Sequence, residues 1–360
     1  MLRPVVVTGV GVVTAGLVGG GDSLRRYLAA PPSRGHVVDD TTVAVDDTTL
    51  AALMDGVDVR RTSRVSRFAL AATRLALADA RLDDVEAAGL VLGTEHGDLH
   101  STIEFADGYL RSGPPGLSPL LFPNTVMNTM VSAATIAVGA RGPAQTLNVR
   151  TVGGELAVAR AAHTVAAGRL EVALAGGVDV RNETVEAALA ELGAGLEVRG
   201  EGATIVVLES LDHALARGAS PIGEILGAAW RGLAARPNGV GRRDESRAIA
   251  GALAEAGVDP SDITWVYGSS SGDGPRDAWE DALLSRALGR RVTVASLAPP
   301  LGQHAGLGAL RVAAATWTAA SGLLGQPPVS VAPGPGLVHG IARGGTHVAL
   351  VVGPAPRETA

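Results

Sequence analysis

Residues 146–180 decide the fold, and they read TLNVRTVGGELAVARAAHTVAAGRLEVALAGGVDV. An apolar run over Thr146–Val149 leads into a turn that contains Gly153 and Gly154, and a segment with helical spacing of its apolar residues follows. A second apolar run, Val172–Ala175, has the length and composition of a buried strand. The stretch therefore predicts a strand, a sharp turn, a helix and a second strand.

A side chain at such a turn lies at a helix N-terminus, where the dipole and free N–H groups lower the pKa of a thiol or stabilise an oxyanion. The residue at that position is Thr151, which is not a thiol. A hydroxyl nucleophile would need a base within hydrogen-bond reach. The structural interpretation is that Thr151 is only a β-branched residue that fills the turn.

The composition bounds the classes of function. The chain has 360 residues, of which 46% are hydrophobic and 18% charged, enough for two half-domains that share one core or for two domains. Its net charge is −6 with no basic run, which argues against nucleic acid or an anionic membrane as a partner. The chain contains no Cys and no Lys, so disulfides, thiolate catalysis and Cys-ligated metals are excluded.

No targeting or cofactor motif stands out. No apolar run approaches the ~18 residues of a membrane span, and the first residues read as a strand without a signal cleavage site, so we expect a cytoplasmic protein. We expect no cofactor and no metal. Gly9 and Gly11 follow an apolar run and leave open a nucleotide-binding turn, but G-x-G-x-x-G is incomplete and no acidic residue follows at the expected distance.

Strand and helix patterns alternate along the chain. Strands are predicted at Pro4–Val13 and Ala88–Gly93, and an amphipathic helix at Ser63–Ala80. This alternation predicts a layered α/β protein with mostly parallel sheets. A strand-first pattern restarts after the loop at Arg217–Pro221, which predicts two halves at 1–217 and 218–360.

One set of motifs resembles a known family. Gly142, Pro143, Thr146, the Gly153–Gly154 pair and Leu174–Gly177 form a frame that resembles the nucleophile elbow of β-ketoacyl synthases, in the thiolase superfamily. The resemblance implies an α/β thiolase fold, with two similar βαβαβ-type halves in a five-layer α-β-α-β-α arrangement. It also implies a decarboxylative condensation that uses a cysteine, two histidines and a lysine.

The positions that match these catalytic residues hold other side chains. Thr151 stands at the cysteine, Ser269 and Gln303 at the two histidines, and Ala298 at the lysine. None of them supplies the charge or basicity of the family residue near pH 7. Ser269 and Gln303 also have a structural interpretation, since most buried polar side chains satisfy backbone groups. His304, next to Gln303, has either an active-site role or a packing role.

Because all four catalytic residues are replaced, the chain is similar to the chain length factor, the non-catalytic β-subunit of type II polyketide ketosynthases. In that family an interface tunnel holds the growing chain, and one helix of the factor closes its end. The matching helix is Leu99–Leu110, with tunnel positions at Leu99, Thr102 and Ala106, whose spacing puts them on one helical face. Ile341 stands at the family's phenylalanine gate. Because Ala106 is small, we expect an open tunnel for a long or reduced, polyene-type chain.

The resemblance also implies partners. The segment Leu120–Ser132 matches the stretch that crosses the dimer axis, so an active ketosynthase would form a heterodimer with it through Phe122, Val126, Met127 and Met130. Acyl carrier protein would bind to this heterodimer and so contact the chain as part of the complex. After Val180 the chain lacks the longer insertion of ketosynthases, which predicts a shorter pocket rim. Two alternatives stay open: a stand-alone acyltransferase that uses Thr151 or His304, and a structural pseudoenzyme without influence on chain length.

Overall fold

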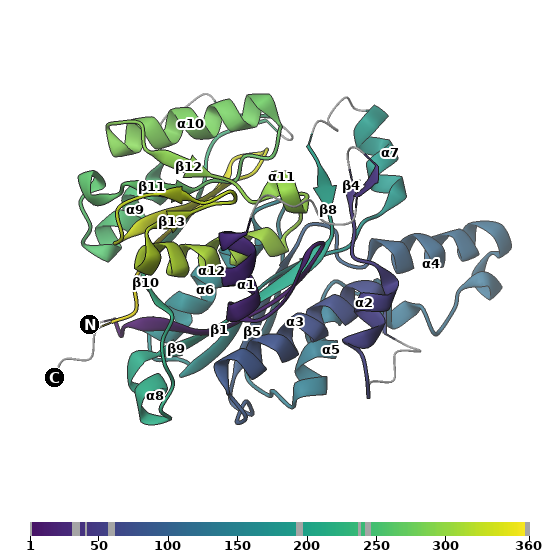
Figure 1. The fold of residues 1–360 in the computed structure, drawn as a ribbon. Coiled ribbons are helices and arrows are strands. Elements are labelled where there is room, and N and C mark those ends of the chain that lie inside the picture. Colours follow the sequence, from purple (N-terminus) through teal and green to yellow (C-terminus); the bar gives the residue numbers. More distant parts are fainter. Residues whose placement is uncertain are drawn as a thin grey trace.

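A computed structural model describes residues 2–30, 37–39, 42–56, 62–191, 197–236, 239–241 and 246–356. Its centre is one large mixed sheet (Figure 1). The strands follow one another across it as β12 (Thr293–Ala295), β11 (Trp265–Tyr267), β15 (Gly336–Ile341), β16 (Thr346–Gly353), β10 (Gly223–Gly232), β1 (Val5–Thr14), β9 (Gly202–Ser210), β7 (Val172–Asp179), β5 (Gly89–Thr94) and β6 (Ala144–Asn148). β2 (Leu17–Gly19) pairs with β1 at the side of this path.

The expectation of mostly parallel sheets is wrong. Four of the strand pairs in the large sheet are parallel, β5–β6, β5–β7, β11–β12 and β11–β15. Six are antiparallel. The reason is visible at β15 and β16, which are joined by four residues, too few for the crossover that a parallel pair requires.

Helices cover the sheet on both faces and divide it into two leaves, so that the chain forms five layers. α6 (Gly153–Ala166) and α12 (Gly306–Ser321) contact strands of both leaves and pack against each other between them. α3 (Arg64–Ala80) and α5 (Thr129–Val138) cover the leaf that contains β5 and β9. α9 (Arg247–Ala256) and α10 (Gly274–Leu288) lie on the outer side of the other leaf (Figure 1). The predicted five-layer thiolase arrangement is confirmed.

Burial explains why these segments form these elements. Every residue of β7 and β9 is buried, as expected for strands covered on both faces, and their sequences are almost uninterrupted runs of small and apolar residues. α12 is buried around most of its circumference, which fits a helix that is apolar on all sides. The predicted helix at Ser63–Ala80 is confirmed as α3, with Ser63 at its N-cap.

The predicted boundary at 217/218 falls between α8 (Leu211–Ala216) and β10. β1 of the first half pairs with β10 of the second along Val5–Val7, so the two halves share one sheet. The division into domains stays a prediction.

Shorter elements complete the structure. They are α1 (Gly21–Ala29), α2 (Asp47–Ala52), α7 (Glu183–Glu191), α11 (Ala298–Leu301), the sheet of β3 (Val37–Asp39), β4 (Thr42–Val43) and β8 (Arg199–Gly200), and the hairpin of β13 (Leu323–Leu324) and β14 (Val329–Ser330). Three short 3₁₀ turns, η2 (Pro114–Gly116), η3 (Phe122–Thr125) and η4 (Pro260–Asp262), lie in connections.

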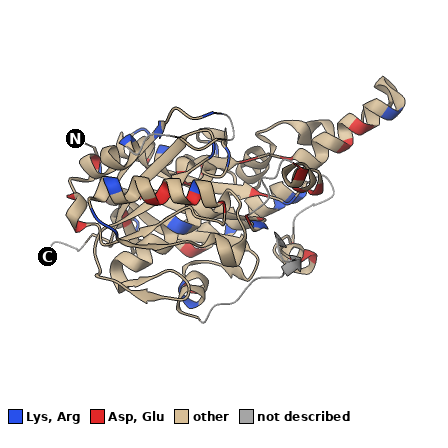
Figure 2. Ribbon diagram, turned by 90° about the horizontal axis from the view of Figure 1, so that it is seen from above, with Lys and Arg blue, Asp and Glu red and all other residues tan. Residues whose placement is uncertain are grey.

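One helix stands apart from the layered body. α4 (Leu99–Ser112) projects from the side that carries α3 and α5, and Ser101 is its one buried residue (Figure 1). In the view of Figure 2, acidic and basic residues are interspersed along the ribbon. In the part of the chain that is described, no helix has the length and apolar character needed to cross a bilayer.

Candidate functional site

The predicted turn between strand and helix is present between β6 and α6, and its backbone is unusual. Thr151 has a φ of +53°, a left-handed conformation that is rare for a β-branched residue. Two close approaches hold the turn: a Cβ on Gly93 would lie 2.1 Å from the backbone of Gly153, and a Cβ on Gly154 would lie 2.2 Å from the Ala305 carbonyl oxygen. The chain therefore keeps the strained geometry typical of a nucleophile elbow.

The Thr151 side chain itself has no chemical partner among the described residues. Thr151 is 5% exposed, and its Oγ1 makes no hydrogen bond there. Oxygen nucleophiles are activated by a base at hydrogen-bond distance, and none is in place.

Ser269 follows β11 and is committed to structural hydrogen bonds. Its hydroxyl donates to Glu280 Oε1 at 2.9 Å and accepts from the Ile341 N–H at 3.1 Å. Glu280 also bonds His339 Nδ1 at 2.8 Å. Burial is the largest single influence on the pKa of Glu280 and raises it. The hydrogen bond and charge of His339, the Ser269 N–H and the charge of Arg276 together keep that pKa below its usual value. Ser269 thus joins β11, α10 and β15, as its structural interpretation predicts.

The loop between α11 and α12 carries Gln303 and His304. The Gln303 backbone N–H donates to the Val198 carbonyl at 2.7 Å, whereas its buried amide side chain bonds no described residue. His304 is 1% exposed, and its Nε2 lies 3.1 Å from Thr14 Oγ1. Burial, reinforced by the charges of Arg199 and Arg311, lowers the pKa of His304 to about 3. Such an imidazole is neutral at pH 7 and a very weak base.

Ala298 begins α11 and is buried, and its N–H donates to Ser296 Oγ at 3.2 Å. Ser296 in turn donates to the Ser270 carbonyl, which links Ala298 to the loop after β11.

Backbone contacts bring these separate segments to the first turn of α6. The Ala305 carbonyl, two residues after Gln303, lies against Gly154. Glu155 of the same turn lies where a Cβ on Gly340 would be, and the next residue, Ile341, bonds Ser269. These contacts bring the segments that carry Ser269 and Gln303 to the turn at Thr151, and Ala298 is linked to the loop after Ser269 through Ser296. We call the four positions Thr151, Ser269, Ala298 and Gln303 the elbow centre.

Sequence reasoning missed the charged groups around the elbow centre. Glu155 and Arg311 are buried and paired at 3.0 Å, and Arg311 also donates to the Gly268 carbonyl at 3.0 Å. Burial raises the pKa of Glu155 although Arg311 opposes the rise. Asp179, at the end of β7, accepts hydrogen bonds of 2.8 Å from Thr94 Oγ1 and from the Ala305 N–H. These pairs join residues 43 to 156 positions apart, so no local sequence pattern predicts them.

The predicted interface residues divide into two groups. Phe122, Val126 and Met127 are 58%, 46% and 40% exposed, respectively. Met130 is fully buried among the core residues of the leaf with β5 and β9, so its assignment to a partner interface is wrong. Met130 points inward because α5 presents one face to α3.

The predicted tunnel residues occupy two places. Leu99 and Thr102 are partly buried at the start of α4, and Ala106 on the same helix is exposed. Ile341 is fully buried on β15 beside Trp279 and Leu283. Their role in a tunnel stays a prediction.

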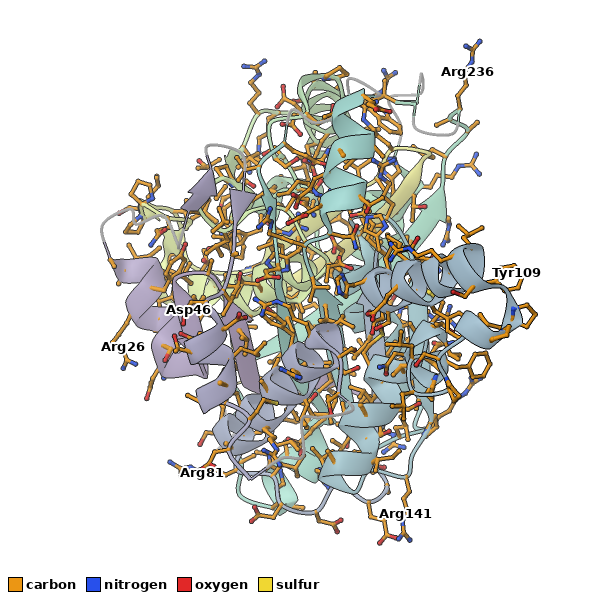
Figure 3. All side chains as sticks on the ribbon, turned by 90° about the vertical axis from the view of Figure 1, so that its right-hand side faces the viewer. Arg26, Asp46, Arg81, Tyr109, Arg141 and Arg236 are labelled. Carbon is orange, nitrogen blue, oxygen red and sulfur yellow. The ribbon has the colours of Figure 1, made fainter. Side chains whose placement is uncertain are left out.

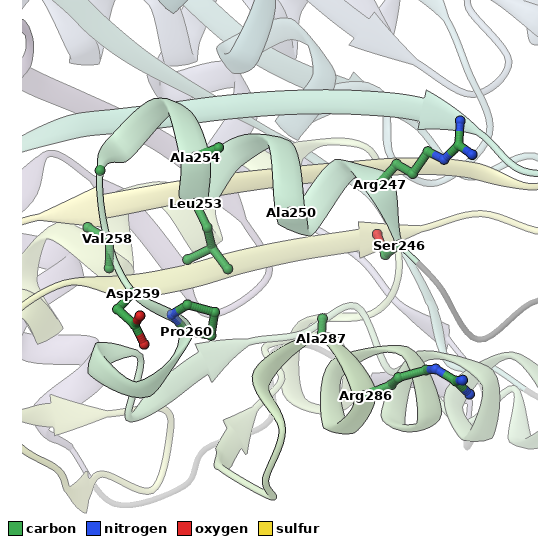
Figure 4. Close-up of a pocket in the computed structure, with 11 residues that line it drawn as sticks. Ser246, Arg247, Ala250, Leu253, Ala254, Val258, Asp259, Pro260, Arg286 and Ala287 are labelled. Atoms are coloured by element: carbon green, nitrogen blue, oxygen red, sulfur yellow. The ribbon is translucent and has the colours of Figure 1, made fainter.

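A surface groove of about 760 Å³ between α9 and α10 is separate from the elbow centre (Figure 4). Leu253, Val258 and Pro260 line it beside Arg247 and Arg286, and its eleven lining residues include none of the predicted site residues. We therefore assign it no part in the chemistry of the elbow.

Comparison of the sequence with known proteins identifies the family to which this chain belongs. The family described as "Beta-ketoacyl synthase, N-terminal domain" matches residues 2–194. The chain belongs to the β-ketoacyl synthase family. Two relatives, each described as a putative polyketide beta-ketoacyl synthase 1, come from Streptomyces halstedii and Streptomyces cyaneus. They are 33% and 30% identical, respectively, and in each case the match covers 87% of this chain and 85% of the relative.

Solved structures of ketosynthases share the fold. The ishigamide ketosynthase/chain length factor superposes with a TM-score of 0.85 at 22% identity, over 99% of this chain and 100% of that chain. A type II polyketide ketosynthase, solved with its acyl-carrier protein and a bound hexaketide, gives a TM-score of 0.83 at 18% identity, with the same coverage. This β-ketoacyl synthase homologue therefore has the fold of the solved ketosynthases.

Proposed function

We propose that this chain is a non-catalytic, ketosynthase-like subunit that pairs with an active ketosynthase and sets the length of a polyketide through a tunnel at their interface. The observation that carries the proposal is the elbow centre, where the family's turn is kept around Thr151 while Ser269, Ala298 and Gln303 replace the groups that condensation requires. A scaffold that retains its strained backbone without the reactive side chains suits a role in shaping a partner's product.

An exposed apolar surface supports association with another chain. Seven large apolar side chains between positions 109 and 136 are at least 40% exposed, and we call them the α4–α5 patch: Tyr109, Leu110, Leu120, Phe122, Val126, Met127 and Ile136. Tyr109 lies at the outer edge of the molecule (Figure 3). A concentration of this kind is uncommon on monomers and is typical of protein–protein interfaces.

The end of the large sheet supports the same conclusion. β6 is the last strand on its side of the sheet, and three of its five residues are exposed. An open strand edge is a template for pairing with a second chain, and native proteins usually cover it. β6 leads into the elbow, and the α4–α5 patch belongs to the segments just before it in the chain. The solved relatives named above include a ketosynthase with its chain length factor, which supports an active ketosynthase as the partner.

Space at the base of α4 supports the tunnel. A groove of about 390 Å³ lies there, and it is lined by His100 and Ser101 of α4, by Leu120 and Leu121, and by Val65 of α3. The lining also contains Arg64, Asp98 and Arg181, so the distal end of an apolar acyl chain would lie against its apolar part, which Val65, Leu120 and Leu121 form. The groove's twelve lining residues do not include Leu99, Thr102 or Ala106. Ala106 is a small, exposed residue farther along α4, and its size favours a long or reduced, polyene-type product.

Reconstitution with an active ketosynthase and acyl carrier protein tests the proposal. We expect the isolated chain to accept no radiolabelled acyl group from the carrier, because its elbow has no activated nucleophile. With the ketosynthase it should form a stable heterodimer, and Ala106→Phe should shorten the products while leaving the heterodimer intact. Ala106→Ser, which adds little volume, is the matched control. If Ala106→Phe leaves the product length unchanged, the chain is a structural partner that has no influence on product length.

A stand-alone acyltransferase is the second candidate, through Thr151 or His304. Both residues are buried, no base among the described residues lies at hydrogen-bond distance from Thr151, and the pKa of His304 is lowered to about 3. Label transfer to the isolated chain that Thr151→Val abolishes would favour this candidate over the subunit.

A further inference from the structure

We infer that a chain of ion pairs closes the front of the elbow centre, so that an acyl-carrier arm cannot reach Thr151 from the surface of this subunit. We call these five residues the ionic seal: Glu95, Arg150, Glu197, Arg199 and Arg276. The inference rests on the proposed function, because it explains how a subunit with a ketosynthase elbow leaves all acyl loading to its partner.

The ionic seal lies where substrates enter layered α/β proteins. Ligands of such folds reach the crevice outside the carboxyl ends of parallel strands. Glu95 directly follows β5, and Arg150 lies two residues after β6, the parallel neighbour of β5. Ser269 and Ser271 follow β11 at the carboxyl end of the parallel strands of the other leaf.

Glu95 is the first centre of the ionic seal. Its Oε1 lies 3.2 Å from Arg150 Nε, and its Oε2 lies 3.2 Å from Arg199 Nη2. The Glu95 side chain is 3% exposed, so both guanidinium groups neutralise a carboxylate that has little contact with water. Arg199 continues the chain, because its Nη1 lies 3.4 Å from Glu197 Oε1.

Glu197 is the second centre and reaches the other leaf. Its Oε2 accepts a hydrogen bond of 2.6 Å from Ser271 Oγ. Arg276 Nη2 donates to Ser271 Oγ and to the Ser269 carbonyl, each at 2.6 Å. The Arg276 side chain is 2% exposed, so this end of the seal is buried as well.

Each arginine of the seal is attached to one position of the elbow centre. Arg150 precedes Thr151 in the chain, Arg199 forms a parallel backbone bridge with Gln303, and Arg276 bonds the Ser269 carbonyl. The ionic seal therefore ties together the walls that would have to separate around an incoming acyl group. Separation would leave buried charges unpaired, which is strongly unfavourable.

A single cysteine at the elbow tests the inference. Because the chain contains no Cys, Thr151→Cys supplies one thiol with no background. We expect N-ethylmaleimide to label this variant at least about a hundredfold more slowly in the folded chain than after unfolding in guanidinium, since local opening must break buried ion pairs. Adding Arg199→Ala should raise the folded rate at least about tenfold.

The controls separate opening of the seal from general loosening. Arg141→Ala removes a largely exposed ion pair with Glu86 and should leave the labelling rate of Thr151→Cys unchanged. If Arg199→Ala fails to fold by circular dichroism, Glu95→Gln, which keeps the shape of the side chain, replaces it. Fast labelling of Thr151→Cys with the seal intact would overturn the inference, as would equal rates with and without the seal residues. Labelling is measured on the isolated chain, so it is independent of whether a ketosynthase binds.

Discussion

Replacing Arg311 by methionine should destabilise the chain in a way that depends on pH. The guanidinium of Arg311 is the cation paired with Glu155 at 3.0 Å, and both side chains are buried. Without it, Glu155 must either stay ionised in an apolar interior or take up a proton. Removing one member of a buried ion pair costs about 3–5 kcal/mol.

Protonation of Glu155 limits this cost and gives it a pH dependence. A glutamate in the unfolded chain has a pKa of about 4.3, so protonating it at pH 7 costs about 3.7 kcal/mol, and at pH 5 only about 1 kcal/mol. Burial already raises the pKa of Glu155 in the folded chain, and loss of Arg311 removes the charge that opposes the rise. A group with a raised pKa in the folded state stabilises the protein at low pH and loses that contribution as pH increases. Arg311→Met should therefore be only mildly destabilising at pH 5 and severely so at pH 7.

Urea denaturation followed by tryptophan fluorescence measures this difference, because Trp265 is fully buried on β11. The loss of unfolding free energy in Arg311→Met should increase between pH 5 and pH 7 by at most about 2.7 kcal/mol, because the raised pKa of Glu155 gives the unaltered chain part of the same pH dependence. The double variant Glu155→Gln/Arg311→Met removes both members of the ion pair, so it should regain stability at pH 7 and show no extra slope from Glu155. A loss that is the same at both pH values in Arg311→Met would refute the reasoning.

Three further outcomes are expected. Phe122→Glu should weaken binding to an active ketosynthase at least about tenfold in a pull-down titration, whereas Leu215→Glu, exposed on α8, should not; equal effects would argue against the α4–α5 patch. Met130→Ala should lower the free energy of unfolding by about 2–5 kcal/mol, since it empties a core position, and a stable variant with impaired partner binding would restore Met130 to the interface. The His304 ring signals in an NMR titration should not move between pH 5 and 8, because its pKa is about 3 and the ring stays neutral throughout that range.

Local sequence patterns predicted those elements whose conformation is set by residues close together in the chain. The glycines at 153 and 154 and the apolar runs on either side of them predicted the elbow, since close backbone approach and burial restrict those positions to few residue types. The spacing in residues 63–80 predicted α3 for the same reason. Matching to the family also assigned four positions to the elbow, and this assignment stays a prediction. The contact of Ala305 with Gly154 and the hydrogen bond of Ile341 with Ser269 connect the segments that carry Gln303 and Ser269.

Features that depend on distant partners were not predictable in this way. Met130 has the same apolar character as the exposed Met127, and only the packing of α5 on α3 distinguishes them. α7 was not expected between Val180 and Arg199, because none of its residues is buried and its pattern is correspondingly weak. The Glu155–Arg311 pair joins residues 156 positions apart, and each looks like an ordinary charged residue of a helix until the helices pack.

The position of β6 has a consequence for how two subunits would influence each other. Its open edge would meet a partner strand, and only four residues separate its last residue from the helix behind the elbow. A partner that shifted β6 by a fraction of a hydrogen-bond length would displace the elbow by a similar amount, with no intervening joint to absorb the movement. Partner binding and the internal dimensions of the cavity would then depend on the same strand. Replacing the partner by a homologous subunit would change the shape of the cavity even if every residue that lines it stayed the same.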